Sequence, residues 1–339
     1  MSGVVGVGLI GYGYWGPNLV RNFLKVRECR VAAVADFDPA KLQAVRTLHP
    51  TVTTTRSPRD LLESSVVDAV VIATPIASHF ELAKEALLRG KHVLVEKPLA
   101  ASSDQARELI RLAEETGRVL MVDHTFVYTG AVRKIRQIIE AGELGDFYYY
   151  DSVRVNLGLF QHDANVLWDL LPHDFSIMTH LLDRAWVSVT AVGAAPVRWD
   201  GWKRESIAYV TVEFADRTLA HFHVNWLSPT KVRRTLIGGS RKMIIYDHLD
   251  PDNQVKVFDH GVEINSDRQR YQALVEYRTG DMLAPKIDQT EALENVCRHF
   301  VECVLTKRRP LTDGEAGLRV VELLEAAQQS LENRVAVRL

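Results

Sequence analysis

The chain has 339 residues, a length typical of about two domains. Hydrophobic residues make up 47% and charged residues 25% of the chain, so a core can form without disulfides or metals. The formal net charge of −2 at pH 7 argues against a surface built for nucleic acid or for an anionic membrane. Cys29, Cys297 and Cys303 have no CxxC spacing, and the apolar stretch at 4–10 is too short to span a bilayer and follows no basic segment. These features predict a cytoplasmic protein whose partners include neither nucleic acid nor a membrane.

Residues 4–122 alternate short apolar runs with amphipathic helical patterns, which predicts a doubly wound α/β domain with a parallel sheet. Strands are expected at 4–10, 31–35, 69–73, 92–95 and 119–122, and helices at 17–26, 39–48, 78–89 and 103–116. Ser78 and Glu81 fit a capping box, and Gly90 and Gly117 stand where glycines end helices.

Residues 123–339 are expected to form a second, α+β domain with a large, mostly antiparallel open sheet. Its strands are expected at 147–156, 187–194, 207–214, 219–226, 235–237, 242–246 and 255–258, and its helices at 130–141, 170–182, 290–305 and 315–331. The predicted domains are therefore 1–122 for dinucleotide binding and 123–339 for substrate binding and oligomerisation.

A G-x-G-x-x-G motif, formed by Gly11, Gly13 and Gly16, follows the first predicted strand and precedes a helix. The first glycine permits a tight turn, the second lets the backbone approach a pyrophosphate, and the third lets the helix pack closely. The variable positions are aromatic: Tyr12, Tyr14 and Trp15. This context predicts a dinucleotide site, and the alternative is a glycine-rich turn without a ligand.

Asp36 ends the second predicted strand, about twenty residues after the glycine motif. A carboxylate there can accept hydrogen bonds from both ribose hydroxyls and would repel a 2′-phosphate. Phe37 and Asp38 follow, so no adjacent arginine neutralises that phosphate, and NAD is favoured over NADP. The alternative is an aspartate that only starts a turn.

Two later strand ends carry polar residues, Thr74-Pro75 and Glu96-Lys97-Pro98. Ligands of doubly wound sheets lie outside the carboxyl ends of the strands, so Lys97 is expected to face the nicotinamide. Its ammonium could stabilise alkoxide character as hydride leaves a carbon, although an ordinary surface lysine is an equally good interpretation.

A third cluster lies around His173, where Pro172 suggests a helix that begins near Asp169 or Leu170. Asp169 and His173 are four residues apart, opposite an apolar stripe, and such a pair suits general acid–base chemistry on a hydroxyl. Two alternatives compete: Asp169 could be only a helix cap, and His180 shares the face without a task. No HExxH or GxSxG motif occurs, which argues against a zinc site and against an α/β-type serine hydrolase.

Taken in order, the glycine motif at 11–16, Asp36, Thr74-Pro75 with His79, Glu96-Lys97-Pro98 and Asp169-x-x-x-His173 resemble the glucose–fructose oxidoreductase/inositol dehydrogenase (Gfo/Idh/MocA) family. The resemblance covers nearly the whole chain and implies hydride transfer between NAD and a ring carbon of a sugar, nucleotide-sugar or cyclitol, without a metal. It implies that Lys97 is the catalytic lysine, that His173 is the acid–base residue, and that Asp169 lies beside the substrate. The cofactor-binding positions expected are residues 11–16, Asp36, Thr74, Pro75, His79, Glu96 and Lys97.

The wording of two segments, Tyr-Trp-Gly-Pro-Asn in the glycine loop and Asn-Val-Leu-Trp-Asp-Leu before His173, is similar to relatives in nucleotide-sugar pathways. This resemblance favours C3 of a nucleotide-linked hexose, with Arg154, Asn156 and Trp168 as substrate residues. It also implies a cis Lys97–Pro98 bond and a homodimer or homotetramer. Relatives with other activities leave alternatives open: an inositol or aminocyclitol dehydrogenase, an NAD-assisted glycosidase, or a non-catalytic NAD-binding regulator.

Overall fold

The computed structural model describes residues 3–158, 160, 164–197, 204–264 and 275–338. The chain forms two compact units, Met1–Tyr128 with Thr290–Glu325, and Thr129–Gln289 with Ala326–Leu339. The pattern of the sequence predicts a single boundary between the domains, at 122/123. In the structure the chain also returns, because a helix that follows the second unit's sheet packs into the core of the first unit.

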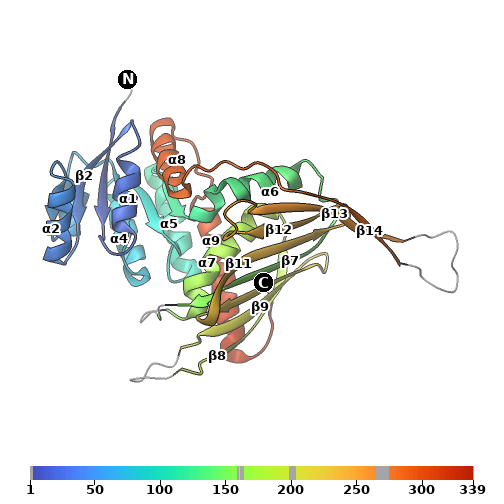
Figure 1. Cartoon of the computed structure of the whole chain (residues 1–339). Helices are drawn as coiled ribbons and strands as arrows, with labels where there is room; N and C mark the ends of the chain where they lie inside the picture. Colours follow the sequence, from blue (N-terminus) through green and yellow to red (C-terminus); the bar gives the residue numbers. More distant parts are fainter. Residues whose placement is uncertain (1–2, 159, 161–163, 198–203, 265–274, 339) are drawn as a thin grey trace. The chain divides into compact units, whose positions relative to one another are not determined.

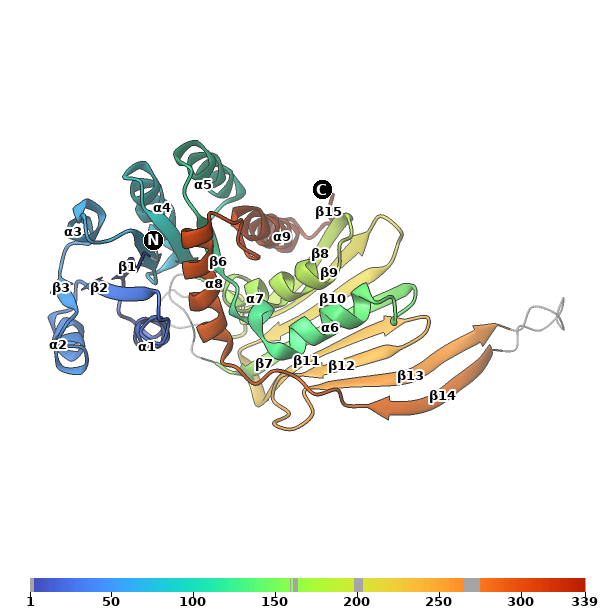
Figure 2. The same ribbon diagram turned by 90° about the horizontal axis from the view of Figure 1, so that it is seen from above.

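The first unit contains a six-stranded parallel sheet in the order β3-β2-β1-β4-β5-β6 (Figures 1 and 2). Its strands are β1 (Val5–Ile10), β2 (Cys29–Ala35), β3 (Thr53–Thr55), β4 (Ala69–Ile72), β5 (His92–Glu96) and β6 (Leu120–Asp123). Its helices are α1 (Gly16–Phe23), α2 (Pro39–Leu48), α3 (Pro58–Glu63), α4 (His79–Leu88), α5 (Ser103–Thr116), α8 (Ala292–Thr306) and the first part of α9 (Gly314–Asn333), with single turns η1 (Ile76–Ser78) and η2 (Thr125–Tyr128). The order and the parallel pairing confirm the predicted doubly wound fold.

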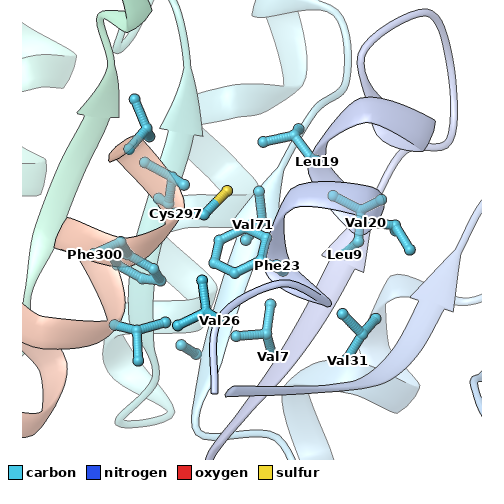
Figure 3. Close-up of a cluster of buried hydrophobic side chains, with 14 of the residues drawn as sticks. Val7, Leu9, Leu19, Val20, Phe23, Val26, Val31, Val71, Cys297 and Phe300 are labelled. Atoms are coloured by element: carbon cyan, nitrogen blue, oxygen red, sulfur yellow. The ribbon is translucent and has the colours of Figure 1, made fainter. Parts of the chain in front are cut away.

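The core of this unit is apolar and joins its two chain segments. Figure 3 shows Phe23 of α1 beside Phe300 and Cys297 of α8, and the two phenyl rings meet edge to face at 6.3 Å. Burial of such large side chains stabilises the fold by roughly 1.5–3 kcal/mol each.

In the first unit two short elements were missed and one local prediction is wrong. The short elements β3 and α3 were not predicted, because the threonines of β3 lack the apolar run that marks a buried strand. Ser78 forms no capping box, since its hydroxyl donates to Pro75 O at 2.8 Å instead of accepting from α4. By contrast, Gly90 and Gly117 have positive φ angles of 74° and 63° after α4 and α5, as predicted.

The second unit contains a nine-stranded, mostly antiparallel sheet in the order β14-β13-β12-β11-β7-β10-β9-β8-β15, in which only β7 and β10 pair in parallel among the described strands. The strands are β7 (Phe147–Leu157), β8 (Trp186–Ala194), β9 (Ile207–Phe214), β10 (Leu219–Asn225), β11 (Leu227–Gly239), β12 (Met243–Asp247), β13 (Val255–Ile264), β14 (Val275–Leu283) and β15 (Val337–Arg338). Two helices, α6 (Gly130–Glu140) and α7 (Val166–Leu181), lie over one face of it, as Figure 2 shows. The sheet confirms the predicted architecture, although β11 is far longer than the expected 235–237 and both β14 and β15 were missed.

Helix α7 begins four residues earlier than predicted. The amide oxygen of Asn165 caps it by accepting from Trp168 N at 3.3 Å, so Asp169 lies in the first turn and is not the cap. Pro172 therefore lies inside the helix and not in its first turn. No helix among the described residues is long and apolar enough to cross a membrane.

Candidate functional site

The three glycines of the β1–α1 loop have different surroundings. A Cβ at Gly11, whose φ is +96°, would lie 2.5 Å from Ala73 O, and one at Gly16 would lie 2.8 Å from Gly11 O. A Cβ at Gly13 would meet nothing within 4 Å. The first and third glycines are thus required by the close approach of backbone to backbone, whereas the second leaves open space beside the start of α1. This cradle fits the pyrophosphate of a dinucleotide.

Substituting Gly13 by alanine is expected to leave the free protein intact and to weaken NAD binding. The added methyl group has room in the empty loop, so the free energy of unfolding should change by less than about 0.5 kcal/mol. It would occupy the space that a pyrophosphate needs, so we expect the Kd for NAD to rise at least about tenfold, or about 1.4 kcal/mol. Urea unfolding and calorimetric titration measure the two effects, and unchanged NAD affinity would refute a phosphate position beside Gly13.

Asp36 directly follows β2, and its carboxylate is held against the glycine loop. Oδ2 accepts from Tyr12 N at 2.6 Å, and Oδ1 accepts from Asp38 N at 2.8 Å. Asp36 therefore starts a turn and also contacts the glycine loop, and its binding of a ribose stays a prediction. The ammonium of Lys41, which sequence reasoning missed, lies 3.6 Å from Oδ2.

Substituting Asp36 by alanine is expected to weaken NAD and to improve NADP binding. The change removes the predicted acceptor for the ribose hydroxyls, worth about 1.5–3 kcal/mol, and leaves Lys41 available to a 2′-phosphate. Fluorescence titration with both cofactors measures the ratio of their Kd values. In the double variant with Lys41→Ala the gain in NADP affinity should disappear. An unchanged ratio in Asp36→Ala would contradict the assignment.

The ends of β4 and β5 are joined through His79, which is buried at the start of α4. Its ring nitrogens lie 2.8 Å from Thr74 O and 2.9 Å from Pro98 O. The Lys97–Pro98 bond is cis, as the resemblance implied. Thr74, Pro75, His79, Glu96 and Lys97 thus belong to one edge of the sheet in the first unit, where Asp36 and the glycine loop also lie.

Three ionisable residues besides Lys97 lie where β5 and β6 end: Glu96, Asp123 and His124. Glu96 is almost fully buried, and burial, together with the charge of Asp123, raises its pKa well above the usual range. Burial also raises the pKa of Asp123 to about 6 and lowers that of His124 to about 3. Sequence reasoning missed Asp123 and His124, although they follow an apolar strand just as Glu96 and Lys97 do.

In the second unit, Trp168, Asp169 and His173 come from the first two turns of α7. The carboxylate of Asp169 accepts a hydrogen bond from the indole N–H of Trp226 at 3.1 Å, and Trp226 is fully buried after β10. His173 is half-buried. Trp226 is a further residue that sequence reasoning missed. The other histidine of the helix, His180, has its pKa lowered to about 4 by burial and by the charge of Arg136.

Arg154 and Asn156 lie two residues apart on β7. Arg154 is only 4% exposed, and it binds Asp174 of α7 through Nε at 2.6 Å and Nη2 at 3.1 Å. Ser152 donates to the same carboxylate at 3.0 Å. The guanidinium of Arg154 therefore joins α7 to the sheet immediately beside His173. Contact of a substrate with Arg154, or with the half-buried Asn156, stays a prediction.

Comparison with known proteins agrees with both units. The family model for the NAD-binding Rossmann fold of an oxidoreductase family, Gfo/Idh/MocA, matches residues 5–124, and the model for that family's C-terminal α/β domain matches residues 136–339. The chain belongs to the Gfo/Idh/MocA family. The glycine cradle and Asp36 are therefore parts of this family's NAD-binding fold. Among the described residues, no group of three or more His, Cys, Asp or Glu side chains could hold a metal ion.

Relatives act on several ring compounds. The scyllo-inositol 2-dehydrogenase (NAD(+)) of Bacillus subtilis (strain 168) is 24% identical over 348 residues, 99% of this chain and 95% of that protein. The dTDP-3,4-didehydro-2,6-dideoxy-alpha-D-glucose 3-reductase of Streptomyces violaceoruber is 44% identical over 86 residues, 25% of each chain. The structure of the UDP-N-acetylglucosamine 3-dehydrogenase GnnA from Acidithiobacillus ferrooxidans superposes with a TM-score of 0.79 at 25% identity, covering 96% of this chain and 97% of that one.

Proposed function

We propose that this oxidoreductase transfers hydride between NAD and C3 of a nucleotide-linked hexose. The observation that carries the proposal is a lysine, Lys97, at the end of β5, on the sheet edge that carries the glycine cradle and Asp36. Two of the relatives named above act at position 3 of nucleotide sugars, which supports both the substrate class and the carbon.

In the oxidising direction, His173 removes the proton of the substrate hydroxyl at an imidazole nitrogen, while the Lys97 ammonium donates a hydrogen bond to the same oxygen. The C–O single bond becomes a carbonyl as the carbon loses hydride, and bound NAD supplies the hydride acceptor. Asp169 lies beside the substrate, and the indole N–H of Trp226 orients its carboxylate by donating a hydrogen bond to it. Asn156 and Trp168 bind the sugar, and Arg154 is a candidate for the same task.

We further propose a homodimer or homotetramer in the cytoplasm. The face of the nine-stranded sheet that α7 does not cover exposes Val192, Tyr209 and Leu219 by 60%, 42% and 45%. Apolar and aromatic side chains gathered on one face are typical of an interface between subunits. All three cysteines are free thiols, which agrees with a reducing compartment. Sedimentation equilibrium tests the assembly, and a monomer at all concentrations would refute it.

The substrate proposal is tested by following NADH absorbance across nucleotide sugars, free sugars, inositols and aminocyclitols. We expect the highest kcat/KM with a nucleotide-linked hexose and an NMR spectrum of the product that shows a keto group at C3. If activity were highest on an inositol, the proposed nucleotide-sugar class would be wrong and the substrate would be a cyclitol. Release of a glycosidic leaving group without net NADH would indicate a glycosidase, and NAD binding without any turnover would indicate a regulator.

A further inference from the structure

Two carboxyl groups end neighbouring strands of the parallel sheet in the first unit. Glu96 is the last residue of β5, Asp123 is the last residue of β6, and the two are directly paired in the register of these strands. Paired residues of parallel strands point to the same face, about 4.8 Å apart. Their side chains are buried, with residue exposures of 8% and 2%. Two carboxyls this close and this dry cannot both be ionised at a low cost in free energy.

The hydrogen bonds around the pair show where a proton is needed. Asp123 Oδ1 accepts from the hydroxyl of Thr125 at 2.6 Å. Glu96 Oε1 and Asp123 Oδ2 are both buried without a hydrogen-bond partner among the described residues. Because carboxylate oxygens only accept, a hydrogen bond between them requires one bound proton.

Lys97 is the cationic neighbour of the pair, because the other ionisable groups that face the pair are neutral. His124 stays neutral, because burial and the charge of Lys97 lower its pKa to about 3. Cys297 of α8 and Tyr128 of η2 both feel the charge of Asp123, and burial raises the pKa of each, so that both stay protonated and neutral. The charge on the carboxyl pair therefore decides the net charge next to the lysine.

We propose that Glu96 and Asp123 share one proton and act as a positioning pair for Lys97, with Glu96 donating to the Asp123 carboxylate. With one proton the pair carries a single negative charge, which balances the ammonium of Lys97. A second negative charge would hold the ammonium against the pair and away from a substrate oxygen. This inference rests on the proposed role of Lys97. Burial raises the pKa of both carboxyls, and the hydrogen bond that Asp123 accepts from Thr125 favours its ionised form, which supports a proton on Glu96.

The proton can be observed without substrate. Carbon-13 NMR of the protein labelled at its Asp and Glu carboxyl carbons, with Glu96→Gln and Asp123→Asn spectra for assignment, follows both titrations. We expect one carboxyl to remain protonated at neutral pH in the wild type. Glu115→Gln, a change at an exposed glutamate of α5, is the control and should leave both titrations unchanged. Ionisation of both carboxyls below neutral pH would overturn the proposal, whatever the activity.

The link to Lys97 is tested by the pH profile of kcat. Glu96→Gln keeps the neutral donor and should retain at least about tenfold more activity than Glu96→Ala, which removes it. The wild-type rate should decline at alkaline pH as the shared proton dissociates, and this decline should be absent in Glu96→Gln. Equal rates for the two variants, or the same alkaline decline in Glu96→Gln, would overturn the positioning role. Failure of the proposed role of Lys97 can be told apart from failure of the positioning pair, since it appears as full activity of Lys97→Ala.

Discussion

Lys97→Ala and His173→Ala are each expected to lower kcat about 100- to 10,000-fold, the range for removing a group that moves or polarises a proton in the transition state. The Kd for NAD should change little in His173→Ala, because the glycine cradle and Asp36, the proposed dinucleotide-binding residues, lie in the other compact unit. Steady-state kinetics with the preferred nucleotide sugar and calorimetric titration with NAD measure the two quantities.

A matched control for His173 lies on the same helix. His180→Ala removes the same kind of side chain from α7, but it has no role in the proposed mechanism, so its kcat should stay within a few-fold of the wild type. If His173→Ala were no slower than His180→Ala, the acid–base role of His173 would be wrong. Full turnover in Lys97→Ala would remove the lysine from the mechanism.

Substituting Arg154 by alanine is expected to lower the free energy of unfolding by about 3–5 kcal/mol. The change leaves the carboxylate of Asp174 buried, at 3% exposure, without the guanidinium that it binds through two nitrogens. Loss of this pair also weakens the link between α7 and β7 beside His173, where the Ser152 hydrogen bond to Asp174 remains, so kcat should fall with stability. Urea denaturation followed by circular dichroism gives the free energy, and kinetics well below the melting temperature give the rate.

An exposed pair serves as the reference for this change. Arg59 and Glu63 of α3 form an i,i+4 ion pair on the exposed surface, so Arg59→Ala should leave the free energy of unfolding almost unchanged. A loss in Arg154→Ala as small as that of Arg59→Ala would contradict a structural role. Preserved stability with a raised KM would instead favour the predicted contact between Arg154 and the substrate.

Much of the first unit could be predicted because its signals are local. Gly11, Gly13 and Gly16 form a motif with fixed spacing directly after an apolar run, and Asp36 follows β2 as its apolar run indicates. The start of α7 was missed because packing outweighs the strongest local signal there. Pro172 is a strong local signal for a first turn, but the Asn165 cap and the burial of the residues around it outweigh that preference.

Local patterns in the sequence were enough to predict the alternation of strands and helices, the dinucleotide motif and the residue types at the strand ends, because all of these depend on neighbours within about one turn or one strand. The pairs of distant side chains that meet became known from the three-dimensional fold: Glu96 with Asp123, Asp169 with Trp226, and Arg154 with Asp174. These meetings depend on strand register and on how a helix lies on a sheet. A shift of one residue in register turns every side chain to the other face, and the residue that lies opposite belongs to a strand far away in the sequence.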